Sequence, residues 1–510
     1  MSRIKKFTRS LISGYAVLGA NIFYTLASVP LALHYLSKPE FGLWALTAQI
    51  AGYVALIDLG MSASVSRILI DHKDDRSTGT YGSIIKIGAL VGVVQGALII
   101  MAGTALSLMA GSLLNIPMQL RGEFVWLMIG QAFLSGITFA ARIFSQMLFA
   151  HQRMDVNNYG LCVSFFFGLA AMWIGFAEGL GIYSFLIGQA VMVLAGVAVS
   201  IIGCIRLELL PKAGEWGAFS RERFVELFAF GQGMFLISVG SQFINTSQMI
   251  LLTRMLGLET TATWAVCTRA YTMVGMVVWR ILDYSAPALS EMVVRKEREK
   301  LLGRLRDITV LMAGLSVVCG TVFAAANGAF VWIWSAGKIS WPPINDVLLG
   351  LWLVVCSVMR VHTGFATITK DLRFLRFIYL IEGSVFIGLN LLAHRIESMT
   401  LMLIFSLAST LMFTLPYGLW RTRKYFEMNW RELVGWLYPT WRMAWRLVPL
   451  AVAVWWLARK LPVRWQFVLD IVVPGIWGTA ALLRYGLGKS LQTEFLSRTP
   501  TWARRFLVRS

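Results

Sequence analysis

Four arginines lie well inside long apolar stretches of this sequence: Arg142, Arg269, Arg280 and Arg360. An arginine near the centre of a bilayer costs on the order of 2.5 to 3.5 kcal/mol even on the mildest insertion scale. Each of these side chains must therefore face protein or water, where a guanidinium can bind an anion. The chemistry that they indicate is the binding of negative charge inside a membrane protein.

The position of each arginine favours a particular role. Arg142 shares a helical face with Gln146, which predicts a polar stripe directed inward, and for Arg142 and Arg360 we favour a cavity role over structural pairing. Arg269 has no nearby acidic residue in its own stretch and is equally suited to lining a cavity and to pairing with another span. Arg67, like Lys86, lies nearer a boundary, where a structural role leads because a long side chain reaches the interface cheaply. Arg67 and Arg280 are nevertheless included among the candidate cavity cations.

Three acidic residues inside the apolar stretches are candidates for ion coupling: Asp58, Asp283 and Glu382. A carboxylate in a low-dielectric site can take up and release a proton. Each could instead neutralise an arginine. Arg280 and Asp283 are three residues apart, so a structural ion pair within one helix is the preferred interpretation of these two.

The elements that must position these residues are transmembrane helices. About fourteen apolar stretches of roughly twenty residues fill the chain. Of the 510 residues, 57% are hydrophobic and only 14% are charged. This composition excludes a soluble protein, and the net charge of +20 does not indicate nucleic-acid binding, because the basic residues gather at predicted membrane edges.

The distribution of basic residues predicts the topology. Alternate loops carry roughly 30 Lys and Arg on the side of the N-terminus against roughly 8 on the other, which places both termini in the cytoplasm. Most of these residues are topology determinants and anchors for anionic lipid. No cleavable signal peptide is expected, because another span directly follows the first.

Six spans followed by six more, each set starting from the cytoplasm, are typical of a tandem duplication that gives two lobes. The segment Leu36 to Trp44 resembles Leu256 to Trp264, at the same spacing, and supports a duplication. The sequence therefore predicts an all-α polytopic membrane protein with two six-helix lobes and two additional C-terminal helices. The expected divisions are an N-terminal lobe (1–205), a cytoplasmic linker that is mobile or lies on the membrane surface (206–223), a C-terminal lobe (224–420), an interfacial connector (421–442), spans 13 and 14 (443–485) and a basic cytoplasmic tail (486–510).

Signatures of enzymes and metal sites are not found. Gly488-Lys489-Ser490 resembles the end of a phosphate-binding loop, but Leu483 stands where the first glycine is required. The five histidines lack ligand spacing, and the five cysteines fall in apolar runs without paired spacing. We therefore expect neither an enzyme nor a metal or organic cofactor.

The second span carries Phe41-Gly42-Leu43-Trp44 and then Asp58-Leu59-Gly60, with Ser64 and Arg67 following, and Ser285 to Ser290 read SAPALS. This pattern resembles the polysaccharide and O-antigen flippases of the multidrug/oligosaccharidyl-lipid/polysaccharide exporter superfamily. The resemblance covers essentially the whole chain through short motifs. It departs from the family at Asn245 to Gln248, where relatives often carry an acidic residue in the seventh helix.

The resemblance implies a V-shaped, MATE-like pair of lobes around a cavity that opens to either side in turn. The cargo would be an undecaprenyl-diphosphate-linked oligosaccharide of lipopolysaccharide or polysaccharide biosynthesis, crossing the bacterial inner membrane with proton or sodium coupling. A polysaccharide polymerase and a chain-length regulator would be its protein partners, beside membrane lipids. Two alternatives stay open, a multidrug or cation antiporter of the same superfamily and a membrane-embedded polysaccharide polymerase or ligase.

Overall fold

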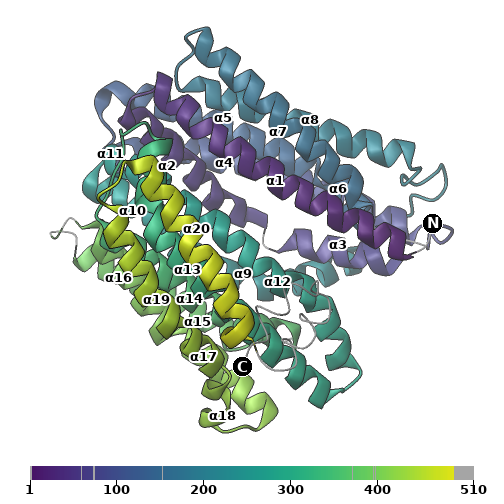
Figure 1. Cartoon of the computed structure of the whole chain (residues 1–510). Coiled ribbons are helices and arrows are strands. Elements are labelled where there is room, and N and C mark those ends of the chain that lie inside the picture. The colour runs from purple at the N-terminus through teal and green to yellow at the C-terminus, as the bar shows by residue number, and fades with distance from the viewer. Residues whose placement is uncertain are drawn as a thin grey trace. The chain divides into compact units, whose positions relative to one another are not determined.

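The computed structural model describes residues 3–58, 60–72, 75–151, 153–369, 371–393, 396 and 398–487. Among these, side chains are described except at positions 3–11, 55, 63, 67, 71, 110, 112, 223, 226–234 and 287. Every regular element in this part of the chain is a helix (Figure 1). By its contacts, the chain forms two compact units, Met1–Ala262 and Thr263–Ser510.

The first unit contains ten α-helices and the start of an eleventh. They are α1 (Arg3–Tyr35), α2 (Lys38–Val54), α3 (Met61–His72), α4 (Thr80–Leu113), α5 (Arg121–Ala140), α6 (Arg142–Ala150), α7 (Met154–Ala177), α8 (Tyr183–Arg206), α9 (Arg221–Asn245), α10 (Ser247–Leu256) and α11 (Leu258–Cys267). Two short 3₁₀ turns, η1 (Ala55–Asp58) and η2 (Met118–Leu120), accompany them.

In its described residues, the second unit continues with nine α-helices and a π-helical turn. They are α12 (Arg269–Val294), α13 (Arg298–Trp334), α14 (Pro343–Ile368), α15 (Leu375–Leu392), α16 (Met399–Met412), α17 (Thr414–Phe426), α18 (Trp430–Gly435), α19 (Tyr438–Ala458), α20 (Val463–Ala481) and the turn η4 (Leu482–Gly486). The long helix α13 is central to this unit, because α12, α14, α19 and α20 all pack against it.

Thirteen stretches of the described helices are long and apolar enough to cross a membrane, so the chain is a multi-pass membrane protein. They agree with the first twelve of the fourteen expected spans and with the fourteenth. The expected thirteenth span, near 444–457, is a helix, α19, but is not among these stretches. It carries Arg442 and Arg446 in addition to its apolar residues, which lowers its hydropathy.

Several spans are built from two helices instead of one. The second is interrupted between α2 and α3, where η1 ends at Asp58 and Gly60 has a φ of 75° that favours glycine. The fourth breaks at Ala141, directly before Arg142, and the eighth at Thr268, directly before Arg269. Broken helices leave backbone groups to be satisfied by side chains, and in transporters they form binding sites.

In each unit, one pair of neighbouring helices packs closely through glycines, and the two pairs occupy corresponding positions. A Cβ on Gly96 of α4 would lie 2.6 Å from the Gly136 carbonyl oxygen of α5, and a Cβ on Gly320 of α13 would lie 2.7 Å from that of Gly350 of α14. These are the third and fourth spans of each predicted half. Small residues on a helix face allow this close packing, and the repeated contact supports the duplication.

The segment after α8 is packed on the start of α4, whereas the sequence predicted a mobile or surface-lying linker. Gly79 has a φ of 73° and Gly217 a φ of 55°, and a Cβ on Gly217 would lie 2.2 Å from the Gly79 carbonyl oxygen. Ser83 Oγ donates to the Ala218 carbonyl at 2.7 Å, and Lys86 Nζ to the Gly217 carbonyl at 2.9 Å. Two glycines allow a backbone-to-backbone approach that composition does not reveal.

Helices α9 and α10, expected in the second lobe, pack within the first unit. Tyr53 Oη of α2 donates to the Gln242 carbonyl at 3.1 Å and is also hydrogen-bonded to Ser247, and Gln49 Nε2 donates to the Asn245 carbonyl at 3.4 Å. The lobe boundary at 205–224 stays a prediction.

Candidate functional site

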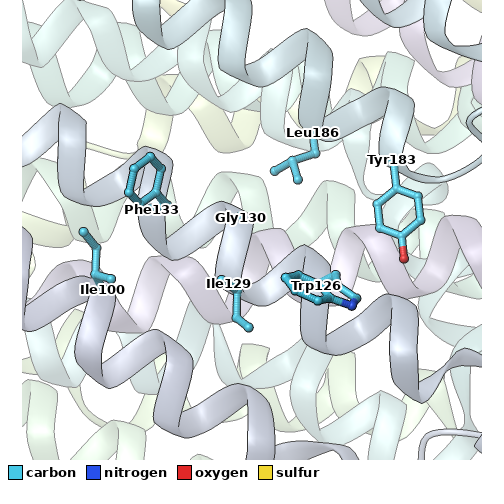
Figure 2. A pocket seen from close by; sticks show the side chains of 7 residues that line it. All are labelled: Ile100, Trp126, Ile129, Gly130, Phe133, Tyr183 and Leu186. Atoms are coloured by element: carbon cyan, nitrogen blue, oxygen red, sulfur yellow. The ribbon is translucent and has the colours of Figure 1, made fainter.

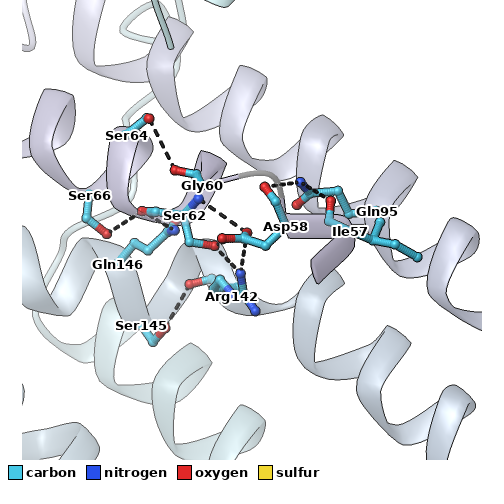
Figure 3. A network of polar contacts seen from close by, with 10 residues as sticks. All are labelled: Ile57, Asp58, Gly60, Ser62, Ser64, Ser66, Gln95, Arg142, Ser145 and Gln146. Atoms are coloured by element: carbon cyan, nitrogen blue, oxygen red, sulfur yellow. Dashed lines mark hydrogen bonds and ion pairs between the residues drawn. The ribbon is translucent and has the colours of Figure 1, made fainter. Parts of the chain in front are cut away.

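The break in the second span places a carboxylate at the start of a helix. Asp58 Oδ1 accepts from the backbone N–H of Ser62, in the first turn of α3, at 3.3 Å and from its Oγ at 2.5 Å (Figure 3). The positive end of a helix dipole favours a negative charge there by about 0.3–1 kcal/mol. The break therefore positions the Asp58 side chain at the start of α3.

Arg142 meets this carboxylate from the fourth span. Its Nη1 donates to Asp58 Oδ1 at 2.7 Å and also to Ser62 Oγ (Figure 3). The Arg142 Cζ lies 3.6 Å from the ring centroid of Phe139. Arg142 is the first residue of α6, where the helix dipole disfavours a cation, so Asp58 compensates both charge and dipole. The two side chains are 25% and 23% exposed, which keeps the pair accessible.

Amide side chains satisfy the backbone around this pair. Gln95 Nε2 of α4 donates to the Ile57 carbonyl at 3.2 Å and to the Asp58 carbonyl at 2.9 Å, which are groups that the broken helix leaves open. Gln146 Nε2 donates to the Ser62 carbonyl at 3.1 Å. The inward polar stripe predicted for Arg142 and Gln146 is confirmed, because both reach α3 (Figure 3).

A second aspartate–arginine pair lies in the other unit. Arg360 Nη2 of α14 donates to Asp283 Oδ1 of α12 at 3.1 Å, and the two side chains are 44% and 47% exposed. Trp279, one turn before Asp283, donates from Nε1 to Ser357 Oγ at 3.2 Å, and its ring centroid lies 5.5 Å from Arg360 Cζ. Asp283 thus pairs across two helices, whereas we expected it to pair with Arg280 in its own helix.

The two pairs occupy matching spans of the two predicted halves. Asp58 and Arg142 lie in the second and fourth of the apolar stretches, and Asp283 and Arg360 in the eighth and tenth. Asp58 follows Trp44 by 14 residues and Asp283 follows Trp264 by 19; Arg142 follows Gly136 by 6 and Arg360 follows Gly350 by 10. Both partners are thus displaced by about one helical turn in the same direction, so the second pair is the shifted counterpart of the first.

Glu382 belongs to α15 in the second unit, and its side chain contacts α16. Its side chain is 1% exposed, and Oε1 accepts from Thr410 Oγ1 at 3.1 Å. The Thr410 hydroxyl also donates to the Ser406 carbonyl at 3.0 Å. Glu382 is thus a buried acid among hydroxyl groups and contacts neither aspartate–arginine pair in the described structure.

The structure describes the side chains of two of the other three predicted cations. Arg269 begins α12 directly after the break at Thr268, and its side chain is exposed. Arg280 is half-buried on the same helix. The side chain of Arg67 lies outside the described residues, although its backbone belongs to α3. The structure therefore brings together Asp58 with Arg142 and Asp283 with Arg360.

The first unit also has a cavity of about 530 Å³ that these residues do not line (Figure 2). Its lining is Ile100, Trp126, Ile129, Gly130, Phe133, Tyr183 and Leu186. An apolar lining offers no compensation for a charged or strongly hydrated group. This cavity is therefore not suited to binding a charged group.

Sequence reasoning missed the polar partners of both pairs. Ser62 and Gln95 complete the first pair, and Trp279 and Ser357 support the second. Gln95 is an amide among the glycines of an otherwise apolar span, and Ser62 stands four residues after Asp58. An uncompensated amide inside an apolar run is a usable signal, because such a group must find a hydrogen-bond partner.

Comparisons with known proteins agree with this architecture. The family model described as "Polysaccharide biosynthesis protein" matches residues 10–293. None of the curated proteins matches the sequence.

Several solved structures share the fold at low sequence identity. A lipid II flippase, MurJ, in an inward closed conformation aligns with a TM-score of 0.65 and 11% identity, over 92% of this chain and 99% of that one. An inward-facing multidrug resistance transporter of the MATE family aligns with a TM-score of 0.61 and 12% identity, over 80% of this chain and 95% of that one. A transporter of the MOP superfamily from Pyrococcus furiosus aligns with a TM-score of 0.52 and 14% identity, over 83% of this chain and 97% of that one.

Proposed function

The chain belongs to the polysaccharide biosynthesis protein family, and from this premise we propose that it is a flippase for lipid-linked oligosaccharides. The cargo is a glycan on undecaprenyl diphosphate, moved from the cytoplasmic to the periplasmic leaflet of a bacterial inner membrane by alternating access. The product serves polysaccharide or O-antigen biosynthesis. Both chain termini lie in the cytoplasm, and a polymerase and a chain-length regulator act after the flippase.

The observation that carries this proposal is the pair of matched aspartate–arginine contacts, Asp58–Arg142 and Asp283–Arg360. Moving a diphosphate unaided through hydrocarbon costs on the order of 20 kcal/mol per charge in the Born limit, so a carrier must supply cations. An arginine held by an aspartate is tolerated in the membrane without cargo. Each arginine can then exchange its carboxylate for a phosphate, which it binds with the same forked geometry.

Arg269, Arg280 and Arg67 complete the set of cations that we propose to contact the cargo. Arg269 supports this role by its exposed side chain at a helix break. The polyprenyl tail needs no polar path and stays in lipid while the head group crosses.

Neutralising the paired arginines tests the proposed function. R142A and R360A should each lower the flipping of a labelled lipid-linked glycan in proteoliposomes by about tenfold, because each loses a charge-assisted contact. The double variant should abolish surface polysaccharide in cells while its membrane level is kept. R153A is a matched control, since Arg153 pairs with Asp155 at 3.1 Å at the start of α7 and is not proposed to bind cargo. Normal flipping by the double variant would exclude the proposed role.

We further propose that Glu382 carries the coupling ion, a proton or sodium, because it is a buried acid with a hydroxyl neighbour. E382Q should make flipping independent of an imposed ion gradient while exchange without a gradient continues. T410V, which removes the hydroxyl but keeps the acid, should remain gradient-dependent. A gradient dependence that survives E382Q unchanged would assign coupling to another group, with Asp58 and Asp283 the next candidates.

The multidrug or cation antiporter is the weaker alternative. The family match is to polysaccharide biosynthesis, and both aspartates are already compensated by arginine, which leaves less negative charge for a cationic drug. Deletion should therefore leave drug susceptibility unchanged. A polymerase or ligase would instead join glycans in proteoliposomes, which the same assay detects as longer products.

A further inference from the structure

Three guanidinium groups gather around one aromatic ring where α19 and α20 meet. The Cζ atoms of Arg442, Arg446 and Arg484 lie 5.1, 4.3 and 5.3 Å from the ring centroid of Tyr485. Arg442 and Arg446 are one turn apart on α19, and Arg484 belongs to the π-helical turn η4. Two segments that are about forty residues apart thus bring three positive charges together.

The fold holds this cluster in place. Met443 and Leu447 of α19 are buried together with Leu482 of η4. A Cβ on Gly486 would lie 2.8 Å from Met443 Sδ, so η4 is packed closely on α19. Such π-helical turns are frequent at functional sites. The convergence of the arginines is therefore fixed by buried contacts and not by the arginines themselves.

The charges of the cluster attract an anion. In the described part of the chain, neither Arg442 nor Arg446 forms an ion pair. Like charges at this separation repel each other, so an anion between the guanidiniums is favourable. Fork-shaped guanidiniums from three directions suit a phosphate, whose oxygens accept several hydrogen bonds.

The surroundings place the cluster at a membrane interface. Trp441 and Trp445 lie next to the two α19 arginines in sequence and are 69% and 73% exposed. Exposed tryptophans beside arginines at the end of an apolar span are typical of the head-group level of a bilayer. The apolar stretch Val463–Gly486 ends at the cluster.

We propose that Arg442, Arg446 and Arg484 form a binding site for the phosphate of an anionic glycerophospholipid. The three guanidiniums bind the head group, Tyr485 orients them, and Trp441 and Trp445 contact the glycerol region of the lipid. The site holds the α19–α20 pair at the interface. It lies outside the proposed cargo pairs and is independent of the flippase proposal.

The test compares lipid binding to the purified full-length chain by native mass spectrometry. Phosphatidylglycerol should bind in preference to phosphatidylcholine, and the variant R442Q/R446Q/R484Q should lose at least about tenfold of that preference, given the electrostatic attraction of each arginine. The control R459Q/K460Q removes two cations at the other end of α19, where Arg459 and Lys460 lie over Trp455 and Trp456, and should keep the preference.

Two further measurements keep the test decisive if the glutamine variant does not fold. R442K/R446K/R484K retains charge without the forked geometry and should keep a weakened preference for phosphatidylglycerol. Inorganic phosphate added at millimolar concentration should not displace the lipid. Equal binding of both lipids by the wild-type chain, a loss of preference only in the R459Q/K460Q control, or displacement by free phosphate would each overturn the proposal.

Discussion

At the scale of single residues, Arg142 and Arg360 differ in how deeply the carboxylate that pairs with them is buried. Asp58 is 23% exposed, caps α3 and pairs with Arg142, whereas Asp283 is 47% exposed and lies on an uninterrupted helix. A more buried pair loses more when one partner is removed, because the other charge is left uncompensated. The two aspartates should therefore differ in their contribution to stability.

This difference gives the first prediction. D58N should lower the free energy of unfolding by about 1–3 kcal/mol, and D283N by less than about 1 kcal/mol, since its pair is half exposed. Thermal unfolding of the purified variants in detergent measures both. A larger loss for D283N than for D58N would contradict the assigned burial and capping.

The sequence predicts which charges lie inside apolar runs but not which of them pair. The cost of an arginine in an apolar run is a local property, so Arg142 and Arg360 could be identified directly. The partner of Arg142 lies 84 residues away in sequence and is set by how α3 packs against α6. Asp283 shows the same limit, because proximity in sequence favoured Arg280 while helix packing placed it against Arg360.

At the scale of elements, glycine contacts determine how closely neighbouring spans pack. In both units, the third and fourth spans meet at a pair of glycines, Gly96 with Gly136 and Gly320 with Gly350. In the third span, glycines recur at helical spacing at positions 88, 92, 96 and 103, a pattern typical of close helix packing. The packed linker on α4 was not predicted, because it depends on positive φ angles at Gly79 and Gly217 and not on composition.

The second unit offers a matched test of such a contact. G320A should destabilise the protein by about 1–3 kcal/mol, because the new Cβ would lie 2.7 Å from the backbone oxygen of Gly350 and must separate α13 from α14. G388A on α15 meets nothing within 4 Å and should be neutral or stabilising by up to about 1 kcal/mol. Thermal unfolding should rank G388A above G320A; the opposite order would show that the glycine contact does not hold the two helices.

At the scale of the whole molecule, each predicted half of the chain contains an aspartate–arginine pair, and the second pair is shifted by about one helical turn relative to the first. Each half holds an aspartate in its second span and an arginine in its fourth. We infer that the duplication kept a compensated cation in each half, ready to exchange its carboxylate for a phosphate of the cargo. The aspartates then act as internal competitors of the head group, and their removal should favour binding.

Binding of undecaprenyl diphosphate to the purified chain tests this exchange most directly. Compared with the wild type, D58N/D283N should bind the lipid more tightly by about tenfold, and R142Q/R360Q more weakly by a similar factor or more, since each variant removes one side of the competition. Weaker binding by the aspartate variant, or unchanged binding by the arginine variant, would contradict the exchange between carboxylate and phosphate.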